Sequence, residues 1–345
     1  MSRKNKDRLG STAATAPVSA HAPGEGGLAY VVPTEFVELP SRGAYYPEAH
    51  PFQDKEVIEM RHMTAKDEDI LTSRSLLKKG LAIDRLIESI LVDKTVDIDS
   101  LLIGDKNAIL VQTRIHAYGP TYDTRVLCPA CATSGTNSFN LMEVGLNHGD
   151  SWAEMNVEGP TDNNTFLIKL PKSGLTAEVR LLTGSDEKSV LKLIENRRKN
   201  QLAETPVTTQ MKQFVVSIDG HTDRTQLNQF IDNMPTLDAQ YLRVAYNRVV
   251  PNVDMTLPYN CAECGTESRL EVPFTADFFG LTDEYMATVY EEFFLLKHHG
   301  GWSFFEAYNL PIALRRWFVE RLAKQFEDEN EQIRQAQQEG KTGRS

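Results

Sequence analysis

Every cysteine in the chain belongs to one of two Cys-x-x-Cys pairs, Cys128 with Cys131 and Cys261 with Cys264. Two intervening residues form a tight turn, here called a knuckle, that lets both sulfur atoms of a pair face one ion. Two knuckles together supply the four thiolates of a zinc ribbon. A site with four protein ligands leaves no coordination position open for a substrate. The sequence therefore predicts one structural zinc ion per chain.

Two other interpretations of the cysteines remain open. Redox-active disulfides are the first, although a thioredoxin-like site has one Cys-x-x-Cys motif at the start of a helix, whereas both pairs here lie between predicted strands. Unrelated free thiols are the second. Gly265 directly follows the second pair, where a knuckle often needs a backbone at positive φ, whereas the glycine after the first pair is the more distant Gly135.

The two pairs lie about 130 positions apart, much farther than the ligands of a compact zinc finger. An internal repeat accounts for this distance. LPSRG at 39–43 recurs as LPKSG at 170–174, and TAKDE at 64–68 recurs as TGSDE at 183–187. Asp105 precedes Cys128 by 23 positions, and Asp238 precedes Cys261 by the same number. Each motif is common by chance, but their preserved order indicates two divergent copies of one unit, at about 36–141 and 167–274, that share one ion.

Hydrophobic periodicity indicates that these units mix strands and helices. In the first unit, strands are expected at 36–39, 56–60, 121–127 and 137–141, two short helices at 64–91, and another helix at 105–116. The expected fold class is α+β, with two related helix-plus-β-hairpin units joined by a four-Cys zinc ribbon and followed by a helical C-terminal module. The expected domains are a flexible arm at 1–28, the two units at 29–150 and 151–276, the helical module at 277–330 and a polar tail at 331–345.

Aromatic and arginine side chains are concentrated near the C-terminal end, where helices are expected at 278–296 and 311–326. These residue types dominate the binding energy of protein interfaces. The second helix is amphipathic, and Arg315 and Arg316 are expected on its exposed face. Alternatively, the aromatic side chains pack inward and complete a helical hairpin. The residues expected to contact a partner are Trp302, Phe305, Tyr308, Arg315, Arg316 and Trp317.

The composition of the 345 residues is typical of a globular protein, with 41% hydrophobic and 25% charged residues. No apolar run is long enough to span a membrane, and the first residues lack the apolar core of a secretory signal.

A zinc-ribbon nucleic-acid-binding adaptor is the alternative function, although the net charge of −11 disfavours contact with nucleic acid. The sequence contains no phosphate-binding loop, zinc-protease motif, nucleophile elbow or dinucleotide-binding turn, and we expect no enzymatic activity. An enzyme with dispersed site residues is a further alternative.

Several segments of the first unit together resemble a known family. They are LPSRGAYYP at 39–47, MTAKDEDILTS at 63–73, SLLKKG at 75–80 and LIGDKNA at 102–108, with Tyr118-Gly119 and the first cysteine pair. Over about residues 30–145 the chain resembles the baseplate hub assembly proteins of contractile-tailed phages of the T-even type. HGGWSFFEAYNLP at 299–311 and RRWFVERL at 315–322 are similar to the C-terminal segment of a second hub assembly factor. That factor is in turn similar to tail assembly chaperones.

The resemblance implies a non-enzymatic role in assembling the baseplate hub, as an assembly factor, a chaperone or a hub subunit. The implied partners are other baseplate hub or tail proteins. No small-molecule substrate, no membrane and no nucleic acid is expected among the partners. The implied location is the host cytoplasm during phage assembly, or the baseplate of the virion. The family brings no catalytic residues to this sequence.

Overall fold

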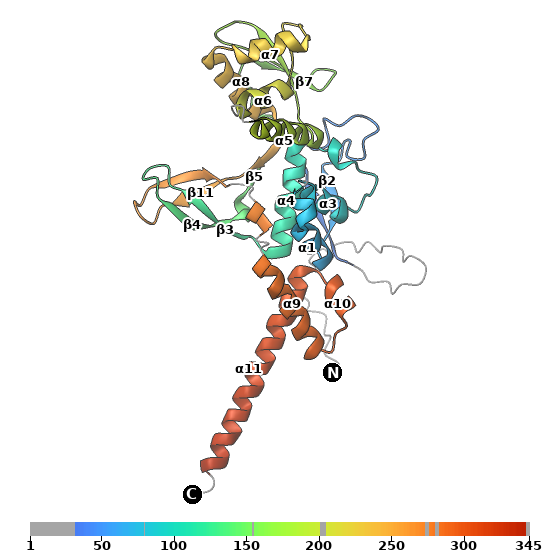
Figure 1. The fold of residues 1–345 in the computed structure, drawn as a ribbon, viewed down its shortest axis with the longest axis vertical. Coiled ribbons are helices and arrows are strands. Elements are labelled where there is room, and N and C mark those ends of the chain that lie inside the picture. Colours follow the sequence, from blue (N-terminus) through green and yellow to red (C-terminus); the bar gives the residue numbers. More distant parts are fainter. Residues whose placement is uncertain are drawn as a thin grey trace, which may run out of the picture.

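The computed structural model describes residues 32–78, 80–153, 155–200, 205–272, 276–279 and 283–342, so the arm predicted at 1–28 lies outside the described residues. The helix α4 (Ile103–Tyr118) lies at the centre of the molecule. Figure 1 shows two β-hairpins projecting to one side of α4, a helix-covered sheet at one end, and the C-terminal helices at the other. Helices and small antiparallel sheets are combined, which confirms the predicted α+β class.

The first unit begins with a β-hairpin and continues with short helices. β1 (Thr34–Glu38) pairs antiparallel with β2 (Val57–Arg61), close to the two predicted strands. Three helices follow where two were expected, α1 (Ala65–Thr72), α2 (Arg74–Lys78) and α3 (Ala82–Ile90). Extended backbone at Ser73 ends α1. A second interruption lies between α2 and α3, where Gly80 has a positive φ of 66°. The apolar residues of this segment therefore cannot share one continuous helical face.

Two hairpins carry the cysteine pairs. The first consists of β3 (Thr121–Leu127) and β4 (Ser134–Asn140), and the second of β11 (Thr256–Asn260) and β12 (Glu267–Glu271). A further sheet joins the two units, because β5 (Gly145–Asn147) pairs antiparallel with β10 (Asn252–Asp254). Short 3₁₀ turns at Ile98–Ser100, Leu141–Glu143 and Ala276–Phe279 connect these elements to their neighbours.

The second unit contains the largest sheet. β6 (Val157–Glu158), β7 (Thr165–Lys169), β8 (Thr176–Arg180) and β9 (Val215–Ile218) are antiparallel neighbours in chain order. Four helices accompany it, α5 (Gly184–Lys199), α6 (Pro206–Phe214), α7 (Arg224–Asp232) and α8 (Thr236–Val249). Strand residues such as Phe166, Ile168 and Val179 are fully buried, so the sheet contributes directly to the main hydrophobic core.

The repeated helix-start motif makes the same contacts in both units. Thr64 and Asp67 form a capping box at the start of α1, and the carboxylate of Asp67 pairs with Arg61 at 2.8 Å. In the second unit the same three roles belong to Thr183, Asp186 and Arg180. Each arrangement joins the end of a strand to the first turn of a helix, where a carboxylate also complements the helix dipole.

The aspartates that precede each cysteine pair hold the repeated Leu-Pro loops. The buried carboxylate of Asp105 accepts a hydrogen bond from the Ser41 N–H at 3.0 Å, in the LPSRG loop. The buried carboxylate of Asp238 accepts from the N–H groups of Lys172 and Ser173, at 2.7 and 2.9 Å, in the LPKSG loop. The repeat found in the sequence therefore corresponds to one loop-to-helix contact made twice, as two related copies would make it.

Replacing Asp105 or Asp238 with alanine is expected to lower the free energy of unfolding by about 1–3 kcal/mol, because buried N–H groups lose their acceptor. Denaturant unfolding measures the change. Asp162→Ala is the matched control, because Asp162 is exposed and surface changes cost within about 0.5 kcal/mol. If the Asp105 and Asp238 variants unfold at the control's midpoint, these contacts do not hold the loops.

Three helices form the C-terminal module, α9 (Asp283–His298), α10 (Phe304–Asn309) and α11 (Ile312–Thr342). Its small core combines Val289, Phe293, Leu296 and Ala307 with Ala65 of α1. α11 continues through most of the segment that was expected to be a polar tail, and Figure 1 shows it extending away from the body. None of the helices in the described ranges, α11 included, is both long and apolar enough to cross a membrane.

The exposed position predicted for Arg315 is wrong. Its side chain is 0% exposed, and its guanidinium pairs with Glu68 at 2.8 Å and with Glu292 at 2.7 Å. Burial lowers the pKa of Arg315, but the two carboxylates outweigh that effect and raise it. Trp317, two positions farther along the helix, is 54% exposed. α11 therefore turns an ion-pairing face toward α1 and α9, so the apolar pattern alone misassigned its buried side.

Candidate metal centre

The four cysteines meet at the tips of the two hairpins, although they come from different units. The Sγ atoms of Cys128 and Cys264 are 3.7 Å apart, and those of Cys131 and Cys261 are 3.8 Å apart. All four sulfur atoms lie within 4.8 Å of one another. The long separation in sequence is thus closed by the contact between β4 and β11, which brings the hairpins side by side.

These distances fit one tetrahedral ion. Zinc–sulfur bonds of about 2.3 Å place the corners of a tetrahedron about 3.8 Å apart. All four cysteines are free in the structure, and no two of them are joined in a disulfide. The arrangement therefore fits a metal held by four thiolates better than the redox-active alternative.

Each knuckle is closed by two backbone hydrogen bonds. The N–H of Cys128 donates to the Thr133 carbonyl at 3.0 Å, and the N–H of Ala132 donates to the Cys128 carbonyl at 2.9 Å. The second knuckle repeats both bonds, with the same lengths, at Cys261, Thr266 and Gly265. The two turns are thus built alike, and each presents its sulfur atoms toward the other.

The residue after each pair adopts the left-handed conformation. Gly265 has a φ of 68°, as expected from the sequence, and Ala132 has a φ of 55° at the equivalent position. Gly135, the first glycine after the first cysteine pair, lies in β4. The signal that identifies Ala132 is its place directly after the second cysteine, although an alanine there is less favourable than glycine.

The local electrostatics favour thiolates on part of the cluster. The N–H of Cys264 helps to lower the pKa of Cys261 to about 6. The hydroxyl of Thr133, 3.3 Å from the sulfur of Cys131, lowers the pKa of that thiol. The N–H of Cys131 also favours the Cys128 thiolate, but burial and the adjacent thiols outweigh it and raise its pKa. Four thiols this close ionise together when a cation offsets their mutual repulsion.

Solvent access differs within each pair. Cys128 and Cys261 are buried, whereas Cys131 and Cys264 are exposed. The buried member of each pair continues a strand whose inward residues belong to the main core, such as Val126 and Tyr259. An ion at this position would therefore couple an exposed turn to the core of each unit.

The predicted docking residues divide between the inside and the surface of the C-terminal module. Trp302 packs against Phe318 with ring centroids 4.7 Å apart, and the hydroxyl of Tyr308 donates to Asp69 of α1. Arg316 is half-buried, with its guanidinium over the ring of Tyr118. Phe305 and Trp317 are more than half exposed. The aromatic residues therefore serve partly as core, which was the alternative interpretation.

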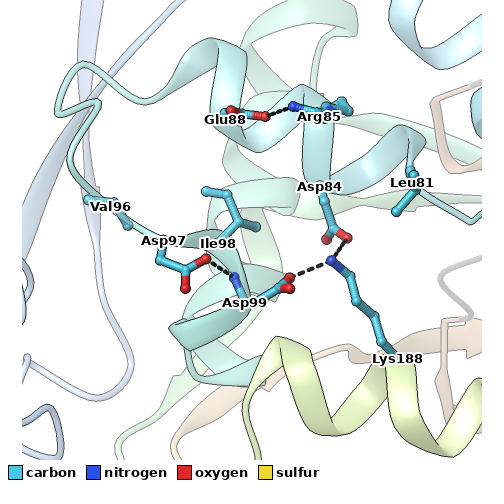
Figure 2. Close-up of a pocket in the computed structure, with 9 residues that line it drawn as sticks. All are labelled: Leu81, Asp84, Arg85, Glu88, Val96, Asp97, Ile98, Asp99 and Lys188. Atoms are coloured by element: carbon cyan, nitrogen blue, oxygen red, sulfur yellow. Dashed lines mark hydrogen bonds and ion pairs between the residues drawn. The ribbon is translucent and has the colours of Figure 1, made fainter.

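A charged pocket of about 320 Å³ lies where the two units meet, and the sequence did not indicate it. Figure 2 shows Lys188 of α5 reaching between Asp84 of α3 and Asp99, and its ammonium lies 2.8 Å from Asp84. Lys106 of α4 pairs with the same Asp84 at 2.8 Å. These ion pairs join the two units. Because the charged groups neutralise one another, the pocket does not have the character of a reactive site.

Comparison with protein families gives one match within this architecture. A family model described as T4 bacteriophage base plate protein matches residues 34–280. The matched range contains both cysteine pairs and both related units, and it ends before α9. Comparisons with curated proteins and with solved structures found no match.

Proposed function

The chain belongs to the T4 bacteriophage base plate protein family, and we propose that it acts without catalysis in the assembly of the baseplate hub. It does so by docking to other baseplate hub or tail proteins, as an assembly factor, a chaperone or a hub subunit. The observation that carries this proposal is the family match, which covers most of the chain and both cysteine pairs. The hub and the assembly role come from the resemblance of the segments at 30–145 and 299–322.

One structural zinc ion per chain is part of this proposal, held by Cys128, Cys131, Cys261 and Cys264. Its support is the tetrahedral spacing of the four sulfur atoms. With four thiolates bound, the ion holds the two hairpins in register and takes no part in a reaction. The related units then act as one rigid body that carries the C-terminal module.

The C-terminal module is the proposed docking surface. Phe305 of α10 is 58% exposed and Trp317 of α11 is 54% exposed, and exposed aromatic side chains are typical of interaction sites. We assign direct partner contact to these two residues and to Arg316. Trp302, Tyr308 and Arg315 support the surface from within, since their own contacts are internal.

A Phe305→Ala, Trp317→Ala double variant is expected to fold and to fail in hub assembly. Truncating an aromatic residue at an interface hot spot costs about 2 kcal/mol or more, or about thirtyfold in affinity. The measurement is complementation of a phage that lacks the protein, with circular dichroism to check the fold. Leu237→Ala on α8 is the control, because Leu237 is also an exposed apolar residue but lies in the second unit. Normal assembly by the double variant would remove this surface from the proposal.

Mass spectrometry of finished particles and of immature tails tests the proposed role. Presence only in immature tails indicates a chaperone that leaves, and presence in both indicates a hub subunit of the virion. Absence from both contradicts a direct role in hub assembly. A salt-dependent shift of DNA by the purified chain would instead favour the nucleic-acid adaptor, which the net charge of −11 opposes.

A further inference from the structure

Three side chains of types that bind metals converge in the first unit, in a cluster separate from the four cysteines. They are Glu35 of β1, His62 directly after β2, and His116 in the last turn of α4. We propose that these residues form a second metal site, which binds one divalent first-row transition ion such as Zn²⁺. Two imidazoles and one carboxylate are a donor set that such ions prefer to Mg²⁺ or Ca²⁺.

The spacing of the donor atoms is close to that of a bound ion. The Nε2 atom of His62 is 3.5 Å from Oε1 of Glu35, and Nδ1 of His116 is 3.8 Å from the same oxygen. Bonds of about 2.0–2.1 Å place tetrahedral ligands about 3.4 Å apart. All three donor atoms already lie within 4.8 Å of one another. Small side-chain rotations therefore suffice to bring all three donor atoms within bonding distance of one ion.

The backbone delivers these donors from three separate elements. The N–H of His62 bonds to the carbonyl of Pro33 at 2.9 Å, which continues the β1–β2 pairing by one step and places His62 beside Glu35. The imidazole of His116 comes from α4 and stacks on that of His62, with ring centroids 5.5 Å apart and 23° between the planes. An ion bound by all three would tie the first hairpin to the end of the central helix.

The state of the histidines also fits a metal. The Nε2 atom of His62 is buried and has no hydrogen-bond partner among the described residues, which is costly unless another ligand satisfies it. The Nδ1 atom of His116 faces the same carboxylate oxygen as His62, so both imidazoles turn a nitrogen toward one point. The competing explanation is a simple ion pair between a protonated His62 and Glu35.

The coordination is incomplete with protein ligands alone. Three donors leave a fourth position for water or for a side chain of a partner. Glu35 is also partly exposed, so an ion could enter and leave from solvent. The site lies next to the point where Thr64 bridges to Pro311, at the junction with the C-terminal module. It is therefore expected to bind more weakly than the four-cysteine site and to exchange its ion.

Calorimetric titration of Zn²⁺ into the full chain, already carrying one tightly bound zinc, tests this site. The wild-type chain is expected to take up one additional ion. His62→Ala and His116→Ala should each weaken this uptake by at least about tenfold, since even residues that only support metal ligands cost 10–100-fold when removed. Glu35→Gln, a change of nearly the same shape, should weaken it as well and guards against misfolding of the histidine variants. His221→Ala is the control, because it removes an exposed histidine from a turn in the second unit.

Two outcomes overturn the proposal. In the first, the zinc-loaded wild-type chain takes up no further ion at millimolar Zn²⁺. In the second, folded Glu35, His62 and His116 variants take up the ion as the wild type and the His221 variant do. Either outcome leaves an ion pair as the role of this cluster. The test does not depend on hub assembly, because it measures metal uptake by the isolated chain.

Discussion

Replacing Cys128 with serine is expected to abolish tight zinc binding and to loosen both knuckles, including the one that carries no substitution. The four sulfur atoms surround one point, so losing one ligand weakens the hold on the other three. Structural zinc contributes about 10–16 kcal/mol of apparent binding free energy in zinc-finger peptides, and that energy is coupled to folding. The expected result is a metal content near zero at the cysteine site and a large loss of stability.

Hydrogen exchange of the β11–β12 hairpin is the decisive measurement for this variant. The N–H groups of Cys261 and Gly265 are hydrogen-bonded in the intact knuckle and should lose protection when Cys128 is replaced. Ala130→Ser is the matched control, because it adds a hydroxyl to the same knuckle and keeps all four ligands. A Cys128→Ser chain that retains its zinc, or that loosens only the β3–β4 hairpin, would contradict a shared ion.

Replacing Arg315 with alanine is expected to destabilise the attachment of the C-terminal module by about 3–5 kcal/mol. The reason is that Glu68 is completely buried and would lose its cationic partner, and an uncompensated buried charge is costly. Denaturant unfolding and hydrogen exchange of α9 and α10 measure the loss. Hub assembly should fail as well, but through misplacement of the docking surface.

Two further variants separate this effect from a general effect of losing a charge. Arg321→Ala removes a cation from an exposed position of the same helix and should change stability by less than about 0.5 kcal/mol. An Arg315→Met, Glu68→Gln double variant should be more stable than Arg315→Ala, because it removes the unpaired negative charge of Glu68. If Arg315→Ala is as stable as Arg321→Ala, the buried ion pair does not anchor the module.

The cysteine cluster could be predicted because its information is local and repeated. Each Cys-x-x-Cys spacing defines a knuckle by itself, and the 23-position interval links each pair to the aspartate that holds the Leu-Pro loop of its unit. The four-stranded sheet at 157–218 was not predicted, because the motifs in that region, LPKSG and TGSDE, mark a loop and a helix start and carry no strand pattern. The boundaries of the predicted domains stay a prediction.

The burial of Arg315 could not be predicted because its partners are set by tertiary structure. Glu68 lies 247 positions away and Glu292 lies 23 positions away, and neither shares a local pattern with Arg315. Arginine is rarely fully buried unless it is paired, so an amphipathic pattern places it outward by default. The same limit applies to Glu35, His62 and His116, which have no motif spacing and meet only through strand register and helix packing.

The length of α11 shows a different limit. Its last turns are polar on every side, and such a segment has no apolar face from which to predict a helix. Residues such as Glu, Gln, Lys and Arg nevertheless favour helices, and contacts four positions apart, such as that between Gln325 and Glu329 at 2.9 Å, support the helix in solvent. Polar composition alone therefore does not distinguish a solvated helix from an unstructured tail.

One ion shared by a knuckle from each unit is what joins the two units in the proposed function. X-ray absorption at the zinc edge, on full chain carrying one zinc ion per molecule, tests this most directly. We predict four sulfur neighbours at about 2.3 Å and no nitrogen or oxygen in the first shell. A shell of two sulfur atoms completed by nitrogen or oxygen, or a chain that binds no zinc and contains disulfides, would contradict the shared site.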